Sequence, residues 1–145
     1  MSKQTDMTRI TLIACVGQKL SHRSKAADLY TSTLFKLSLK YARKQRPDDI
    51  FILSAKHGLL PLDKEIYPYE QTLNNMLSAE IKAWADEVID QLREVCRLDE
   101  TEFTFLAGEK YRRYLLPHIK HKKIPLQGLR IGEQLQRLKE LCDER

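Results

Sequence analysis

Residues 52–61 read ILSAKHGLLP, so an apolar segment runs directly into Lys56 and His57. A lysine can hold a phosphate group, and a neighbouring histidine can move a proton near neutral pH. Two further apolar segments are followed by a glycine and a lysine, in ACVGQK (14–19) and AGEK (107–110). We interpret these three segments as parts of one site.

The predicted site combines proton-transfer groups with groups that bind phosphate. The catalytic candidates are one thiol, one imidazole and two carboxylates, namely Cys15, His57, Glu70 and Glu109. The binding candidates are glycines that allow close backbone approach, lysines and hydroxyl side chains, namely Gly17, Lys19, Ser54, Lys56, Gly58, Tyr69, Gly108, Lys110 and Tyr111. The segment YPYEQTL (67–73) is predicted to fold over the site as a lid, with Tyr69 able to stack on a base.

A structural interpretation stands beside each functional one. Cys15 can be a small buried side chain at a strand end. His57 can be a turn residue that caps a helix or a carbonyl group, and Glu109 can be the anion favoured in the first turn of a helix. The sequence leaves both interpretations open.

Several chemistries are excluded because their motifs are missing. The chain has no GxxxxGK[ST] phosphate loop, no GxGxxG dinucleotide fingerprint and no GxSxG nucleophile elbow. Its three cysteines are far apart without a CxxC pair, and a deaminase zinc motif is missing, so neither a metal nor a cofactor is indicated. A small cationic pocket remains, which suits a nucleotide, or a nucleobase within a polynucleotide.

The net charge of +5 is unevenly distributed. The stretch from Lys19 to Arg46 contains Asp28 as its one acid, and the stretch from Lys110 to Lys123 contains none. If the fold brings the stretches together, they form a basic face that can bind a nucleotide or a nucleic acid. Solvated helix faces are also lysine-rich, and the spacing alone does not decide between the two interpretations.

The apolar pattern predicts the elements that must position the site. With 145 residues, of which 42% are hydrophobic, residues 1–145 are predicted to form a single α/β domain. Strands alternating with helices are typical of a three-layer Rossmann-like or flavodoxin-like domain, with a mostly parallel sheet of about four strands. The predicted strands are 9–14, 50–53 and 103–107, the predicted helices 24–46, one capped by Ser78 and one over 131–142, and residues 56–77 are expected to be irregular.

The predicted location is cytoplasmic. No apolar run approaches the roughly 20 residues that span a bilayer, so no membrane partner is expected. The N-terminus is polar and the cysteines suggest no disulfide framework, which favours a reducing compartment. The oligomeric state is not predicted.

The motifs ILSAKHGLLP, YPYEQTL and LAGEKYRRYLLP resemble a bacterial and phage family of small domains of unknown function, over about residues 10 to 140. The resemblance implies an α/β fold and assigns no reaction. The segment ACVGQKLSHRSKAADLYTS also resembles a strand end of a domain in archaeosine synthase, a tRNA base-modifying enzyme. It differs at residues 16–19, which read VGQK where a serine and paired lysines are usual. This similarity suggests a modified base as substrate.

Together these observations predict an enzyme that acts on a nucleobase or nucleotide, by glycosidic or group transfer at a base in nucleic-acid modification. His57 and a carboxylate, either Glu70 or Glu109, would have the acid–base roles, with Cys15 as a nucleophile and the lysines as phosphate ligands. The alternative is a module that binds a nucleotide or a nucleic acid without turnover.

Overall fold

The computed structural model describes residues 7–14 and 18–143. Its centre is a five-stranded sheet in the order β4-β3-β1-β6-β7. The strands are β1 (Thr8–Ala14), β3 (Asp49–Ser54), β4 (Gly58–Pro61), β6 (Thr101–Leu106) and β7 (His121–Lys123). A separate two-stranded ribbon pairs β2 (Ser24–Lys25) with β5 (Glu65–Ile66).

The sheet is mostly parallel, as predicted. β1 pairs in parallel with both β3 and β6, so that Ile10 lies opposite Asp49 on one side and Phe103 on the other. β7 extends the parallel set, and β4 returns antiparallel along β3. The expectation of about four strands was wrong, because β4 lies in a segment that was expected to be irregular. A tight turn, with Gly58 at φ +71°, lets this short apolar run pair with β3.

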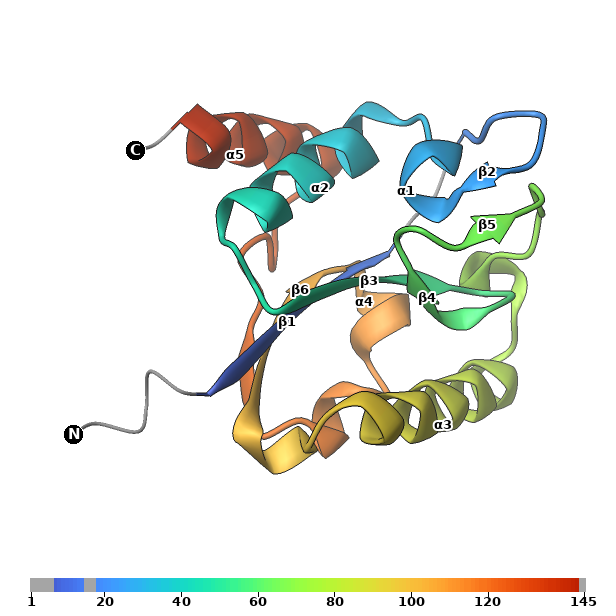
Figure 1. Ribbon diagram of the computed structural model, residues 1–145, viewed down its shortest axis with the longest axis vertical. Helices are drawn as coiled ribbons and strands as arrows, with labels where there is room; N and C mark the ends of the chain where they lie inside the picture. Colours follow the sequence, from blue (N-terminus) through green and yellow to red (C-terminus); the bar gives the residue numbers. More distant parts are fainter. Residues whose placement is uncertain (1–6, 15–17, 144–145) are drawn as a thin grey trace.

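Helices cover both faces of the sheet (Figure 1). α2 and α5 lie side by side over one face, and α3 lies over the other, on the same side as α4. The helices are α1 (Ala26–Leu29), α2 (Thr33–Lys44), α3 (Ser78–Val95), α4 (Glu109–Arg112) and α5 (Ile131–Asp143). Short 3₁₀ turns occur at Leu73–Asn75, Leu98–Glu100 and Leu116–His118.

The predicted helix over 24–46 is interrupted. Its first residues form β2 and α1, and α2 begins only at Thr33. The Ser32 hydroxyl oxygen accepts a 3.2 Å hydrogen bond from the Phe35 amide, which caps α2 and starts a new helix. Before this cap, Tyr30 forms an antiparallel bridge with Lys19. The interruption therefore ties the loop after β1 to the start of α2.

The start of α3 also differs from the prediction. Ser78 is its first residue and does not cap it, because the N-cap position belongs to Leu77. The Glu80 carboxylate accepts a 2.8 Å hydrogen bond from the Leu77 amide. Glu80 thus satisfies a backbone donor that would otherwise have no partner at the helix terminus.

Each face of the sheet has its own apolar core. On the α3 face, Phe103 and Phe105 pack with Trp84. On the α2 face, Ile13 and Ile52 pack with side chains of α1 and α2. Because both faces are covered, the central strands are apolar along most of their length, and polar side chains concentrate at the edges.

Candidate functional site

The carboxyl ends of β1, β3 and β6 lie along one edge of the sheet, at Ala14, Ser54 and Leu106. This confirms that the three strand ends meet. Ligands of open α/β sheets bind outside this edge, at the point where connections leave toward opposite sides. Here the chain leaves β1 for β3 on one side and later reaches β6 on the other, so the switch point lies between β1 and β6.

A pocket of about 310 Å³ lies at this switch point, and we call it the switch pocket. Its volume falls at the lower end of the range for small-molecule sites. The apolar part of its wall includes Leu34, Phe105 and Leu126, and polar side chains come from Ser38 of α2 and Gln134 of α5. The pocket therefore offers apolar surface for a flat ring together with a few polar groups that can orient it.

The predicted residues Gly108, Glu109, Lys110 and Tyr111 all line the switch pocket. A side chain at Gly108 would meet nothing within 4 Å, so a ligand can approach the backbone there. Lys110 is exposed and forms no ion pair with any residue in the described part of the chain. Its ammonium group is available to an anion at the rim of the pocket.

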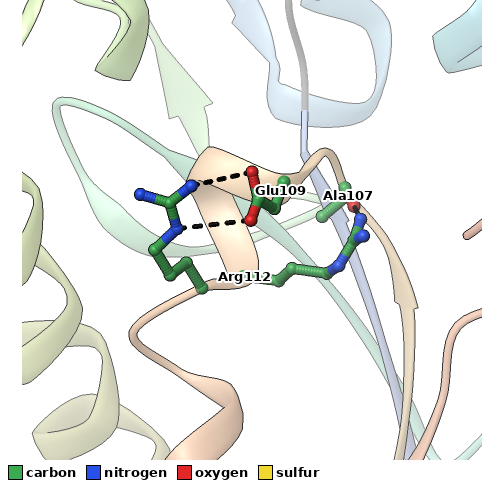
Figure 2. A network of polar contacts seen from close by, with 4 residues as sticks. Ala107, Glu109 and Arg112 are labelled. Carbon is green, nitrogen blue, oxygen red and sulfur yellow. Dashed lines mark hydrogen bonds and ion pairs between the residues drawn. The ribbon is translucent and has the colours of Figure 1, made fainter. Parts of the chain in front are cut away.

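Glu109, the first residue of α4, is engaged by Arg113, which directly follows this helix (Figure 2). The Arg113 guanidinium donates to both carboxylate oxygens of Glu109, at 2.9 and 3.3 Å, and this pairing raises the pKa of Arg113. Arg112 lies on the other side of the same turn and donates a 2.7 Å hydrogen bond to the Ala107 carbonyl oxygen. Glu109 therefore acts as an ion-pair partner in this structure, and its carboxylate is not paired with His57.

Tyr111 anchors α4 to the α3 side of the molecule. It is buried, and its ring packs edge-on against Trp84 at 5.7 Å between centroids. Its hydroxyl oxygen accepts a 3.4 Å hydrogen bond from the Leu73 amide. These contacts fix the wall of the switch pocket, so Tyr111 positions the site more than it presents a free ligand group.

A second group of predicted residues gathers at the end of β3. The Ser54 hydroxyl, 1% exposed, donates a 2.8 Å hydrogen bond to the Tyr69 hydroxyl oxygen. Ser54 also accepts from the amides of Lys56 and His57, at 3.2 and 3.0 Å. The Tyr69 hydroxyl in turn lies 2.5 Å from that of Tyr30. We call Ser54, His57 and Tyr69 the β3-end cluster.

The surroundings of His57 favour its neutral imidazole form. Its ring packs edge-on against the Tyr69 ring, with 5.5 Å between centroids. Burial lowers its pKa below the usual 6.5, and the positive charges of Lys56 and Lys64 lower it further. The Nε2 atom is buried and has no hydrogen-bond partner among the residues that the structure describes. A neutral ring with an unpaired nitrogen is suited to proton transfer.

The prediction that Tyr69 stacks on a base does not fit its environment. Tyr69 does fold back to the strand end, but it is only 8% exposed. One face of its ring is occupied by Lys19, whose Nζ lies 4.7 Å from the ring centroid. Lys19 also lies 5.6 Å from the Tyr30 ring centroid, so this lysine joins the β3-end cluster through cation–π contacts.

The turn between β3 and β4 carries Lys56 and Gly58. Lys56 is exposed and can reach an anion. Gly58 has a structural role, because its positive φ disfavours a side chain and an added Cβ would displace the Gln91 amide. Gln91 accepts a 2.8 Å hydrogen bond from the Leu59 amide and donates a 3.4 Å bond to the His57 carbonyl oxygen. Gln91 of α3 thus holds the turn that carries His57.

Among the predicted residues that the structure describes, Glu70 does not join either group. Glu70 is exposed, and its carboxylate makes no hydrogen bond or ion pair with a described residue. Cys15 and Gly17 lie outside the described residues. The sequence analysis also missed Tyr30, Trp84 and the helical walls of the switch pocket, because these come from distant segments that only the fold brings to the edge.

Within residues 7–14 and 18–143, no group of three or more His, Cys, Asp or Glu side chains could hold a metal ion. In the same ranges, no helix is long and apolar enough to cross a membrane.

Comparison with known proteins identifies a family. None of the curated proteins matches the chain. A family model of unknown function, DUF6884, matches residues 10–140, which include both the switch pocket and the β3-end cluster. Because this match covers far more than half of the sequence, the chain belongs to the DUF6884 family.

Proposed function

We propose that this protein binds a nucleotide or nucleobase in the switch pocket and acts on the base as an enzyme of nucleic-acid modification. The observation that carries the proposal is the pocket itself, which lies at the switch point with apolar walls and Lys110 at its rim. Apolar walls such as Leu34 and Phe105 suit the faces of a base, and Lys110 suits a phosphate. We also propose that the fold is Rossmann-like or flavodoxin-like.

His57 is the proposed acid–base group. Strands of a sheet are spaced about 4.8 Å apart, so the ends of β3 and β6 lie about 10 Å from each other across β1. A nucleotide bound between them can therefore reach both the switch pocket and the β3-end cluster. The neutral imidazole would take a proton from the attacking group during glycosidic or group transfer, and Lys19 and Lys56 would hold negative charge nearby.

The resemblance of the first loop to archaeosine synthase supports a base in a nucleic acid as the substrate. A cytoplasmic location agrees with such a substrate and is part of the same proposal.

A binding module without turnover is the second candidate, and one observation favours it. Neither Glu70 nor Glu109, of which one was expected to assist His57, forms a hydrogen bond or ion pair with it, since Glu109 pairs with Arg113 and Glu70 is exposed without a described partner. Hydrolysis of a glycosidic bond commonly uses two carboxyl groups. Without the second group, the same pocket would still recognise a nucleotide.

The first test concerns binding. Thermal unfolding is measured with a panel of nucleobases, nucleosides and nucleoside monophosphates, because a ligand of the folded state raises Tm. Leu126→Trp fills the switch pocket, whereas Leu129→Trp alters the same connector at a position that does not line it. We expect a shift that Leu126→Trp abolishes and Leu129→Trp preserves. A ligand shift that survives Leu126→Trp would place the ligand elsewhere and would refute the proposal.

The second test separates enzyme from binding module. The ligand is incubated with the protein and an oligonucleotide, and the products are read by mass spectrometry. His57→Gln should remove turnover while leaving the ligand-induced Tm shift intact. Binding without any product from the unmodified protein would favour the binding module.

A further inference from the structure

A second hollow, of about 560 Å³, runs along α2. Lys36, Lys40 and Arg43 line it, and all three are exposed. Their spacing of four and three residues places them on one face of the helix, and we call them the α2 basic stripe. Leu34 and Ser38 line the switch pocket from the opposite side of the same helix. α2 is therefore the wall between the two hollows.

The α2 basic stripe carries an excess of positive charge, although the acid Asp28 also lines the same hollow. None of its cations forms an ion pair within the part of the chain that the structure describes. Lysine and arginine side chains of α3 behave differently, since Lys82 pairs with Asp86 and Arg93 with Asp90. The stripe is thus a row of cations whose natural complement is an anion with repeated charges.

The helix that carries the α2 basic stripe begins near the carboxyl edge of the sheet. α2 follows α1 and runs back toward the start of β3 (Figure 1), and Leu34 in its first turn lines the switch pocket. A helix with its side chains is about 10 Å wide, a distance that a flexible strand crosses within a few nucleotides. An extended polyanion on the stripe can therefore pass around the start of α2 and place one unit in the switch pocket.

We propose that a single-stranded polynucleotide lies with its phosphodiester backbone along the α2 basic stripe and inserts one base into the switch pocket. This inference rests on the proposed function, and it specifies the substrate as a polynucleotide in place of a free nucleotide. The strand is single because a base within a duplex stack cannot enter a pocket until it is unpaired and turned out. Phosphate contacts of this kind fix the register of the strand without reading its sequence.

The test measures binding of labelled single-stranded RNA and DNA oligonucleotides by fluorescence anisotropy at several salt concentrations. The stripe variant carries Lys36→Gln, Lys40→Gln and Arg43→Gln, and the matched control carries Lys82→Gln, Arg93→Gln and Arg97→Gln, which remove the same charge from the α3 side. Glutamine is a good helix former, so both variants should keep the fold. Circular dichroism checks that they do.

We expect the stripe variant to weaken oligonucleotide binding about tenfold or more, and to reduce the slope of log affinity against log salt by about 2. The control should change both quantities much less. Equal losses in the two variants would indicate diffuse attraction and would overturn the inference, as would an unmodified protein that binds no oligonucleotide. RNA and DNA arms show which sugar is preferred.

A mononucleotide arm keeps the two proposals apart. The stripe variant should retain the Tm shift that a nucleoside monophosphate produces in the unmodified protein. Suppose that Leu126→Trp leaves that shift intact while the stripe variant still loses oligonucleotide affinity. The proposal that the switch pocket binds the nucleotide is then wrong, and the proposal that the α2 basic stripe binds the phosphodiester backbone stands. If the unmodified protein binds a mononucleotide but no oligonucleotide, the proposed role of the α2 basic stripe is wrong and the proposed role of the switch pocket stands.

Discussion

The indole N–H of Trp84 donates a 2.8 Å hydrogen bond to the carbonyl oxygen of Ser54, which joins α3 to the carboxyl end of β3. The same Ser54 residue holds Tyr69 through its hydroxyl group. Ser54, at the end of β3, thus connects the apolar core on the α3 face of the sheet to the β3-end cluster, which includes His57. This connection acts together with the Gln91 hydrogen bonds, which hold the turn after β3 from the same helix.

Replacing Trp84 with Phe should destabilise the protein by about 1–3 kcal/mol through the lost hydrogen bond, with a further loss from the smaller ring. Because Trp84 is the only tryptophan, urea unfolding is followed by circular dichroism. Lys82→Gln, on the exposed face of the same helix, serves as the control and should change stability little. An unchanged urea midpoint for Trp84→Phe would show that the hydrogen bond does not secure the strand end.

Replacing Gly58 with Ala should destabilise the protein by about 1–2 kcal/mol or more. The added Cβ requires an unfavourable positive φ and overlaps the Gln91 amide oxygen, which also holds the Leu59 amide. Gly132→Ala is the matched control, since its Cβ would meet nothing within 4 Å and alanine favours the helix. Thermal unfolding should show a lower Tm for Gly58→Ala and an equal or higher Tm for Gly132→Ala.

Replacing Tyr69 with Phe should cost about 1–3 kcal/mol, because the Ser54 hydroxyl loses its acceptor inside the protein and Tyr30 loses a partner. The aromatic ring remains, so the cation–π contact with Lys19 should persist. Tyr67 is 67% exposed, so Tyr67→Phe removes a hydroxyl group from an exposed residue and should leave the urea midpoint unchanged. If the two variants were equally stable, the hydrogen bonds of the Tyr69 hydroxyl group would make no net contribution to the free energy of unfolding.

Much of the sheet could be predicted from the sequence. The run at 50–53 is fully apolar, and the run at 103–107 is apolar except for Thr104, because β3 and β6 are covered on both faces. The structure places these strands at Asp49–Ser54 and Thr101–Leu106. β4 could not be predicted in this way. Its four residues form a strand because they pair with β3, and such pairing is a tertiary effect that local preference does not encode.

The site was predictable to the same degree. The rule that parallel strand ends share an edge brings Lys19, Ser54 and Gly108 to one side of the molecule. The side chains that contact these residues come from distant parts of the sequence. Ser54, for example, donates to Tyr69, which contacts Tyr30 across 39 residues of sequence. The walls of the switch pocket depend on the packing of α2 against α5, for which the sequence carries no local pattern. The break before α2 was readable, since Ser32 is a good N-cap residue.

The pKa of His57 makes stability depend on pH in a defined direction. Burial, together with Lys56 and Lys64, lowers the pKa in the folded state below the unfolded value near 6.5. Between these two values the unfolded state binds more protons, so the free energy of unfolding falls as the pH falls below about 6.5 and levels off below the folded pKa. The acids Glu87 and Asp90 also line the hollow beside His57, and the net shift of the His57 pKa is downward.

His57→Gln removes this contribution, so the difference in urea midpoint between the unmodified protein and the variant should narrow or reverse from pH 7.5 to pH 5.5. His118→Gln is the control, because His118 is exposed and its replacement should change stability little. The same ionisation predicts that any turnover declines only below pH 6.5, when the imidazole becomes protonated. A midpoint difference that stays constant over this pH range would mean that His57 has the same pKa in the folded and unfolded states.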